Sequence, residues 1–179
     1  MTHVANIYPH HDLLNVAFYH FEVIQQKSND SDSEAIALDC ISCLIALSIG
    51  VEGLINFCGD KIVENWKERQ AYHKKLKQTA DALKLKFDES AEPFSTLALL
   101  KTLRDDMVHP KPIERQGKVA SKEELNKLME TSWDPYCNYE FVQHAFNQVN
   151  EFERLIYAEP DIQKSGILTG ASGWGKIDA

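Results

Sequence analysis

The sequence predicts an all-α protein, an antiparallel bundle of about four long helices plus one short helix with a flexible C-terminal tail. Apolar residues recur at three- and four-residue steps over most of the chain, and no segment shows the alternation of a β-strand or an internal repeat. The 179 residues suit one domain with its own core. We therefore expect a bundle over residues 1–158 and a Gly-rich tail over residues 159–179.

The first helix is expected over about residues 11–27. The second begins after Asp32 or Ser33, either of which can cap a helix, and runs to about residue 58. It is apolar around most of its circumference, which indicates the centre of the bundle. Its most apolar stretch, residues 41–51, is well short of the roughly 20 residues that span a bilayer, so no membrane span is expected.

The third helix is expected at about residues 63–85, with an apolar stripe on a strongly basic background. The fourth follows Pro93 and must end near His109, because Pro110 disfavours helical geometry in the residue before it. Two further helices are expected, a short polar one at about 121–131 and a long one at about 136–157.

The net charge of −8 argues against broad, charge-driven binding to nucleic acid, although residues 61–86 form a locally basic segment. The four cysteines lie in apolar helical segments, and the first ten residues lack the features of a signal peptide. These observations predict a reduced, cytoplasmic protein.

One pair of residues carries the chemistry that the sequence suggests. Arg104 and His109 lie five positions apart where the fourth helix finishes. On a regular helix this spacing corresponds to a rotation of about 140°, so the two side chains would lie on different faces. Because the helix ends at Pro110, His109 can leave the helical path and turn towards Arg104.

Such a pair suits RNA cleavage without a metal. An imidazole, whose ordinary pKa is about 6.5, can move the proton of a 2′-hydroxyl, while a guanidinium binds phosphate oxygens in a bidentate manner. Asp105 precedes His109 by four residues, a helical neighbour able to orient its ring. The structural alternative is a surface ion pair for Arg104 and a favourable position for His109 at the negative end of the helix.

The segment around this pair resembles a known family. The stretch Leu99–Arg104, then His109–Pro112, and upstream the central-helix segment Val51–Phe57 are similar to the HEPN superfamily of helical domains, whose nucleases carry an R-x-x-x-x-H type motif at the end of a late helix. The resemblance covers roughly residues 35–112. This chain departs from the family at Asp105, where asparagine is common.

The resemblance implies a homodimer in which two motifs face each other across a cleft and act as a metal-independent endoribonuclease. His109 would be the general acid or base, Arg104 would bind the phosphate and Asp105 would position His109, with Lys101 and Lys111 as substrate-binding residues. Many relatives are toxins or act in defence against phage, some with a nucleotidyltransferase-type antitoxin. No cofactor or metal is expected, and the partner is RNA.

Glu52 is the only charge within the apolar centre of the second helix, and such a charge must be paired or lie near a polar cleft. It can face the motif as an auxiliary residue, or it can have a structural partner such as an arginine. For the whole domain, the alternatives to a nuclease are a non-catalytic module that binds a nucleotide, RNA or a partner protein, and a dimerisation domain.

Other signals favour structural interpretations. Cys40 and Cys43 share a helical face, but nothing at a suitable spacing supplies further zinc ligands, so buried thiols are expected. The adjacent His10 and His11 are expected at a solvated terminus. The basic third helix can follow an RNA backbone, although solvated helix faces commonly carry such charge.

Overall fold

The computed structural model describes residues 2–30, 34–165 and 170–174, and the predicted all-α class is confirmed. Seven α-helices, one 3-10 turn and two short strands lie within these ranges. In chain order the elements are β1 (Thr2–Asn6), α1 (His10–Asn29), α2 (Ile36–Ile62), α3 (Tyr72–Ala82), α4 (Phe94–Val108), α5 (Lys122–Met129), the 3-10 turn (Asp134–Tyr136), α6 (Tyr139–Tyr157), α7 (Pro160–Ser165) and β2 (Gly170–Trp174).

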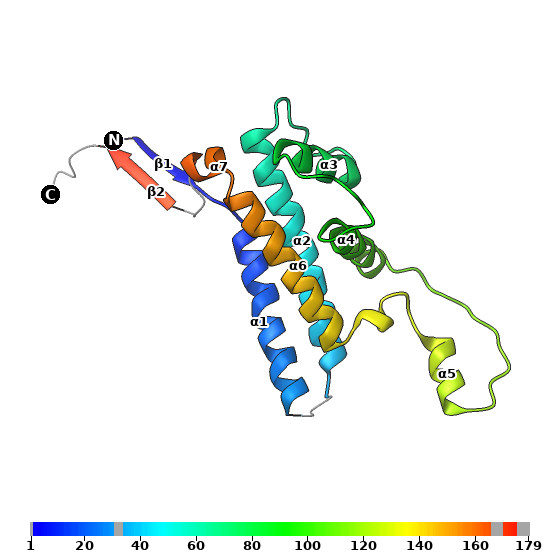
Figure 1. The fold of residues 1–179 in the computed structure, drawn as a ribbon. Helices are drawn as coiled ribbons and strands as arrows, with labels where there is room; N and C mark the ends of the chain where they lie inside the picture. Colours follow the sequence, from blue (N-terminus) through cyan, green and yellow to red (C-terminus); the bar gives the residue numbers. More distant parts are fainter. Residues whose placement is uncertain (1, 31–33, 166–169, 175–179) are drawn as a thin grey trace.

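The central position predicted for the second helix is confirmed. α2 contacts α1, α3, α4, α6 and α7. Figure 1 shows α1, α2 and α6 side by side, with α3 and α4 on the flank of α2. Helices on several sides remove most of the apolar surface of α2 from water, which is the main favourable term in folding. Its buried residues are Cys40, Cys43, Leu44, Ala46, Leu47, Ser48, Gly50, Val51, Leu54, Ile55, Phe57, Cys58 and Gly59.

Among the described helices, α2 alone is long and apolar enough to cross a membrane by length and composition. More than half of its most apolar window is buried inside the bundle. This burial is what a core helix requires.

Two helices begin later than the sequence predicts. Asp32 and Ser33, the expected caps of the second helix, lie outside the described residues, and α2 begins after Ala35, whose φ is 54°. Residues 63–71 form a loop instead of the first part of the third helix, because Asn65 has a φ of 56° and Trp66 folds back onto α2. The Trp66 ring occupies the space where Gly59 lacks a side chain.

The structure at the two chain ends was not predicted. The sequence analysis expected no strands and a tail after residue 158. β1 pairs in antiparallel register with β2, with Thr2 opposite Trp174. α7 follows α6 directly, and its Ile162 is fully buried in the core, so the bundle extends beyond residue 158. Residues 166–169 and 175–179 of the expected tail lie outside the described residues. Pairing between the two ends is non-local, so short-range periodicity could not predict it.

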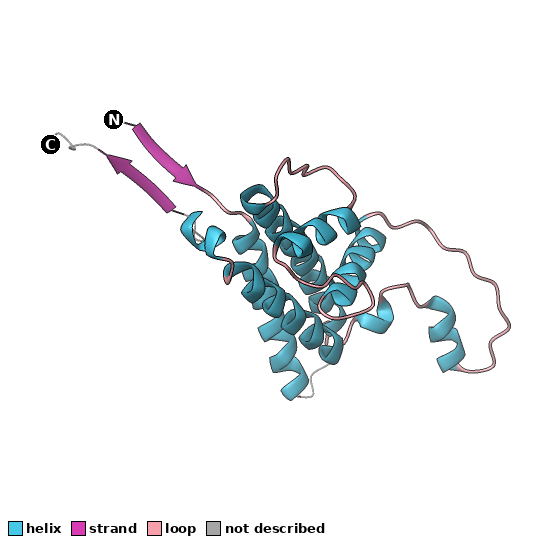
Figure 2. Cartoon of the chain, turned by 45° about the horizontal axis from the view of Figure 1, so that its top comes forward, coloured by secondary structure: helices cyan, strands magenta, loops and turns pink. Residues whose placement is uncertain are grey.

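Residues 109–133, which we call the arm, leave the bundle between α4 and the 3-10 turn. Figure 2 shows the arm and the β1–β2 ribbon leaving the bundle on opposite sides. α5 lies within the arm and has no buried residue. Ser121 caps α5 by accepting the Glu124 amide, and the Glu124 carboxylate accepts the Ala120 amide, an arrangement close to a capping box.

Candidate functional site

The end of α4 has the geometry that the proline predicts. α4 ends at Val108, and His109 has φ −120° and ψ 49°, outside the helical region. Its amide still donates to the Asp105 carbonyl at 3.0 Å. Pro110 has no amide hydrogen, so the helix cannot continue and the chain turns into the arm.

Arg104 and His109 line the same open groove beside the end of α4. The groove has a volume of about 690 Å³. It also contains both lysines that the sequence analysis places at the substrate. Its lining residues are Lys101, Arg104, Asp105, Asp106, His109, Pro110, Lys111, Ile113, Ser132 and Trp133. The groove therefore combines a guanidinium, an imidazole and two ammonium groups with the carboxylates of Asp105 and Asp106.

A carboxylate of the central helix α2 binds the Arg104 guanidinium. Its Nη2 donates to Glu52 Oε2 at 2.7 Å, and its Nη1 lies 3.2 Å from Asp105 Oδ1. Its Nε is buried and has no hydrogen-bond partner among the described residues. The two carboxylates thus fix the plane of the guanidinium and leave donor capacity unused.

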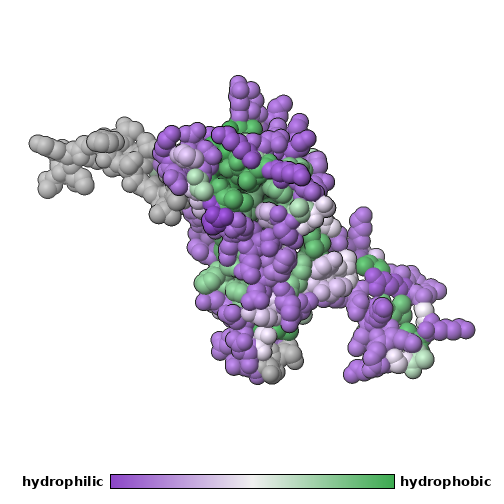
Figure 3. All heavy atoms as spheres, in the orientation of Figure 1, coloured by the Kyte–Doolittle hydropathy of each residue, from purple (hydrophilic) through white to green (hydrophobic). Residues whose placement is uncertain are grey.

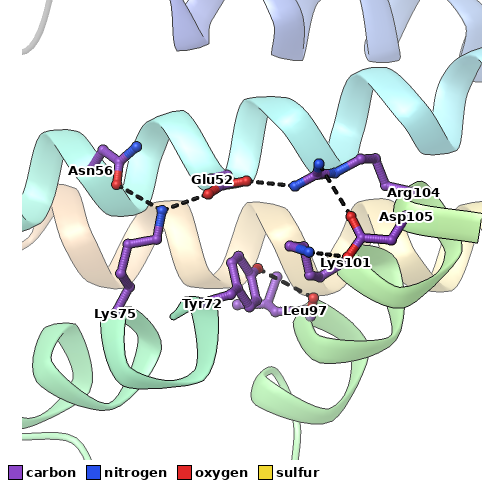
Figure 4. Close-up of polar contacts among 8 residues, drawn as sticks. All are labelled: Glu52, Asn56, Tyr72, Lys75, Leu97, Lys101, Arg104 and Asp105. Carbon is purple, nitrogen blue, oxygen red and sulfur yellow. Dashed lines mark hydrogen bonds and ion pairs between the residues drawn. The ribbon is translucent and has the colours of Figure 1, made fainter. Parts of the chain in front are cut away.

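The sequence left two interpretations of Glu52 open, a position facing the motif or a structural arginine partner. Both agree with the structure, because the arginine partner of Glu52 is Arg104 of the motif. Its second oxygen, Oε1, accepts a hydrogen bond from Lys75 Nζ at 2.5 Å, and Lys75 also donates to Asn56 Oδ1 at 3.2 Å. Figure 4 shows this chain of contacts running along α2 from Asn56 to Arg104. Glu52 itself lines a different groove, against the start of α1, and contacts Arg104 from outside the groove of the motif.

Lys75 is a residue that the sequence analysis missed. Only 2% of it is exposed, in a helix that otherwise reads as basic and half solvated. The signal was present, because Lys75 lies four residues before buried Thr79 and next to buried Leu76, so it falls on the buried side of α3. A lysine on that side must find a carboxylate, and Glu52 is that carboxylate.

Asp105 does not orient His109 in this geometry. Its carboxylate pairs with Lys101 and lies beside Arg104, and no hydrogen bond joins it to the His109 ring within the described chain. The carboxylate leans back along α4 because two cations lie on that side, whereas His109 has left the helix. Asp105 therefore shapes the position of the arginine rather than that of the histidine.

The far wall of the groove comes from the arm, which the sequence analysis did not connect with the site. Ser132 donates to Asp106 Oδ2 at 2.7 Å and so joins the end of the arm to α4. Trp133 and Ile113 complete this wall. Local periodicity could not have predicted that Ser132 and Trp133 reach the groove, because 20 or more residues separate them from the motif.

Cys40 and Cys43 are fully buried, as expected for apolar thiols. Burial raises the pKa of the Cys40 and Cys43 thiols to about 12. Among the described residues, no three His, Cys, Asp or Glu side chains are grouped to hold a metal ion. The solvated terminus expected at His10 is wrong, because His10 is 3% exposed and its Nε2 lies 3.2 Å from Tyr157 Oη.

No known protein family matches the chain, and neither the curated proteins nor the solved structures include a significant match to it. The geometry of the groove is therefore the basis for any functional assignment.

Proposed function

We propose that this chain is a metal-independent endoribonuclease of HEPN type, in which His109 moves the reacting proton and Arg104 binds the scissile phosphate. The observation that carries the proposal is that these two side chains line one open groove although a regular helix would separate them. The groove also supplies Lys101 and Lys111 for neighbouring phosphates.

The reaction follows from the residues in the groove. His109 accepts the proton of a 2′-hydroxyl, whose oxygen attacks the adjacent phosphorus. A bond forms between the 2′-oxygen and phosphorus, the bond from phosphorus to the 5′-oxygen breaks, and the leaving 5′-oxygen takes up a proton from water, while the protonated His109 returns its own proton to solvent. The products are a 2′,3′-cyclic phosphate and a 5′-hydroxyl. Arg104 stabilises the charge that develops on the phosphate oxygens.

The two carboxylates in the groove are compatible with an anionic substrate. Asp105 is paired with Lys101 and Arg104, and Asp106 accepts a hydrogen bond from Ser132. Because cations balance the charge of Asp105, the field that meets an incoming phosphate is less repulsive than the count of acidic residues suggests.

The test is cleavage of single-stranded RNA by purified protein in the presence of a chelator, with analysis of the product ends. We expect the wild type to leave 2′,3′-cyclic phosphates, and we expect His109→Ala to be inactive with an unchanged melting temperature. Arg104→Lys keeps the charge but loses the bidentate geometry, so it is expected to be strongly impaired. Intact RNA with the wild type, or an active His109→Ala, contradicts the proposal.

The cellular role that the HEPN resemblance implies is that of a toxin or phage-defence component acting as a homodimer. If so, expression of the wild type slows growth while the His109→Ala control does not. Sedimentation of the purified chain tests the dimer. Growth inhibition that is relieved by a co-expressed nucleotidyltransferase would identify the antitoxin.

The second candidate function is RNA or nucleotide binding without cleavage. Asp105 favours it, because Arg104 is shared between Glu52 and Asp105 and must leave part of the Asp105 contact to grip a phosphate. Protein that leaves RNA intact but shifts its mobility in a gel supports this function over the nuclease.

A further inference from the structure

A second hollow continues from the groove of Arg104 and His109 onto the arm. It has a volume of about 410 Å³ and shares Lys111, Ile113 and Trp133 with the first groove. Its other lining residues are Arg115, Leu128, Met129, Glu130 and Thr131. A ligand chain that passes the histidine can therefore extend directly into this second hollow.

The walls of the hollow are held in place by the arm itself. Arg115 Nη1 donates to the carbonyls of Leu128 and Glu130, at 3.1 and 2.5 Å, which joins the start of the arm to the end of α5. The Thr131 amide donates to Asp134 Oδ2 at 2.7 Å and fixes the turn beside Trp133. Contacts within the arm thus hold these walls together.

The lining combines apolar and aromatic side chains with charged ones, and its apolar members are Ile113, Leu128, Met129 and Trp133. Ile113 is 62% exposed and Met129 is 63% exposed, beside the half-buried Trp133. Figure 3 shows hydrophobic spheres on the otherwise hydrophilic arm. Exposed side chains of this kind next to a cationic groove favour a ligand that joins a flat apolar ring to an anion.

We propose that Trp133 and Ile113 form a subsite that stacks an unpaired base of an RNA strand whose phosphate lies at Arg104. This inference deepens the proposed function and rests on it. Every base has a π-face, so stacking on an indole ring is tolerant of sequence. Bases inside a duplex are already stacked and cannot reach the arm, so the subsite selects single-stranded RNA. Lys111 lines both hollows and serves the phosphate between them.

The test measures binding of a short, fluorescently labelled single-stranded RNA to the His109→Ala protein, which cannot cleave it. In this background Trp133→Ala should weaken binding about tenfold, the usual effect of removing one stacking partner. Trp133→Phe should retain most of the affinity. The matched control is Tyr19→Ala, which removes an exposed aromatic ring from α1, far along the chain from the groove, and should not change affinity.

A second readout separates stacking from a structural role of Trp133. RNA should quench part of the tryptophan emission of the His109→Ala protein, and Trp133→Phe should abolish that part while still binding. The same RNA annealed to its complement should bind equally to proteins with and without Trp133. Unchanged single-strand affinity in Trp133→Ala, or a quench that survives in Trp133→Phe, overturns the subsite.

These outcomes are distinct from those of the cleavage test. Wild-type protein that stacks RNA on Trp133 but never cuts it overturns the nuclease and retains the subsite. Protein that cuts RNA equally well with and without Trp133 retains the nuclease and overturns the subsite. Ile113→Ser serves as a second variant if Trp133→Ala lowers the melting temperature, and it should weaken single-strand binding in the same direction.

Discussion

Glu52 and Arg104, 52 residues apart in the chain, form an ion pair of 2.7 Å between the centre of α2 and the end of α4. The pair connects the most buried helix of the protein with the candidate phosphate site. Because the other oxygen of Glu52 accepts from Lys75, one carboxylate pairs with two cations. The guanidinium is therefore oriented before any substrate arrives, which reduces the ordering that binding must otherwise supply.

The first prediction concerns the carboxylate of Glu52. Glu52→Gln leaves Lys75, which is 2% exposed, without a charged partner and releases Arg104. Breaking a buried ion pair on one side is strongly destabilising, so we expect the free energy of unfolding in urea to fall by about 3 kcal/mol. RNA cleavage should fall as well, because Arg104 loses its orientation. The control is Glu64→Gln, at an exposed glutamate, which should change neither quantity.

Lys75→Met is the contrasting change on the other side of the pair. It leaves Glu52 with Arg104 as a partner and replaces a buried lysine by an apolar side chain of similar length. We expect a loss of about 1 kcal/mol or less, clearly smaller than for Glu52→Gln. Equal losses of unfolding free energy in the two variants would show that the contact between Glu52 and Lys75, and not the contact between Glu52 and Arg104, accounts for the stabilisation.

The second prediction concerns the carboxylate of Asp105 in the groove. Asp105→Asn removes a negative charge from the groove and also frees Lys101 from its pair. A single exposed charge a few ångströms from a phosphate is worth about 1 kcal/mol, so single-stranded RNA should bind roughly fivefold more tightly at low salt. Titration by fluorescence anisotropy measures this. The gain should shrink as salt is added, and weaker binding would contradict the proposed phosphate site.

The third prediction follows from the burial of His10. Burial and the neighbouring His11 lower the pKa of His10 to about 4, whereas a histidine in the unfolded chain titrates near 6.5. Between these values the unfolded chain binds a proton that the folded protein does not, so stability falls as the pH is lowered through this window. Between about pH 7 and about pH 5 the loss due to His10 should be about 2 kcal/mol.

Urea denaturation at the two pH values checks this expectation. His10→Gln should lose about 2 kcal/mol less than the wild type over the same interval. The control is Asn15→Gln, at an exposed residue of the same helix without a titratable group, which should retain the wild-type dependence. An identical pH dependence in His10→Gln would mean that His10 does not titrate abnormally.

The fourth prediction concerns the contact between Gly59 and Trp66. A Cβ atom at Gly59 would lie 2.3 Å from the Trp66 ring, so the indole must move for the chain to fold. We expect Gly59→Ala to destabilise the protein by about 2 kcal/mol, as overpacking in a core does. Gly117→Ala is the control, because its Cβ would meet Leu128 at an ordinary 3.4 Å. Equal melting temperatures for the wild type and Gly59→Ala would refute the close packing.

The sequence by itself determined the features that depend on neighbours along the chain. The periodicity of apolar residues gave the helical class and the central position of α2, and Pro110 placed the end of α4 at Val108 with His109 outside the helix. The Arg104 to His109 spacing could likewise be identified without coordinates. These signals are local, since helix geometry and proline stereochemistry act over a few residues.

Only the tertiary structure decided which distant side chains meet. The partner of Glu52, the burial of Lys75, the wall that Trp133 contributes to the groove and the pairing of β1 with β2 all join segments far apart in the sequence. The sequence placed Asp105 on the side of His109, but the nearby cations Lys101 and Arg104 draw its carboxylate the other way. Spacing along a helix states which contacts are allowed, and the competition among charges in the folded protein selects one of them.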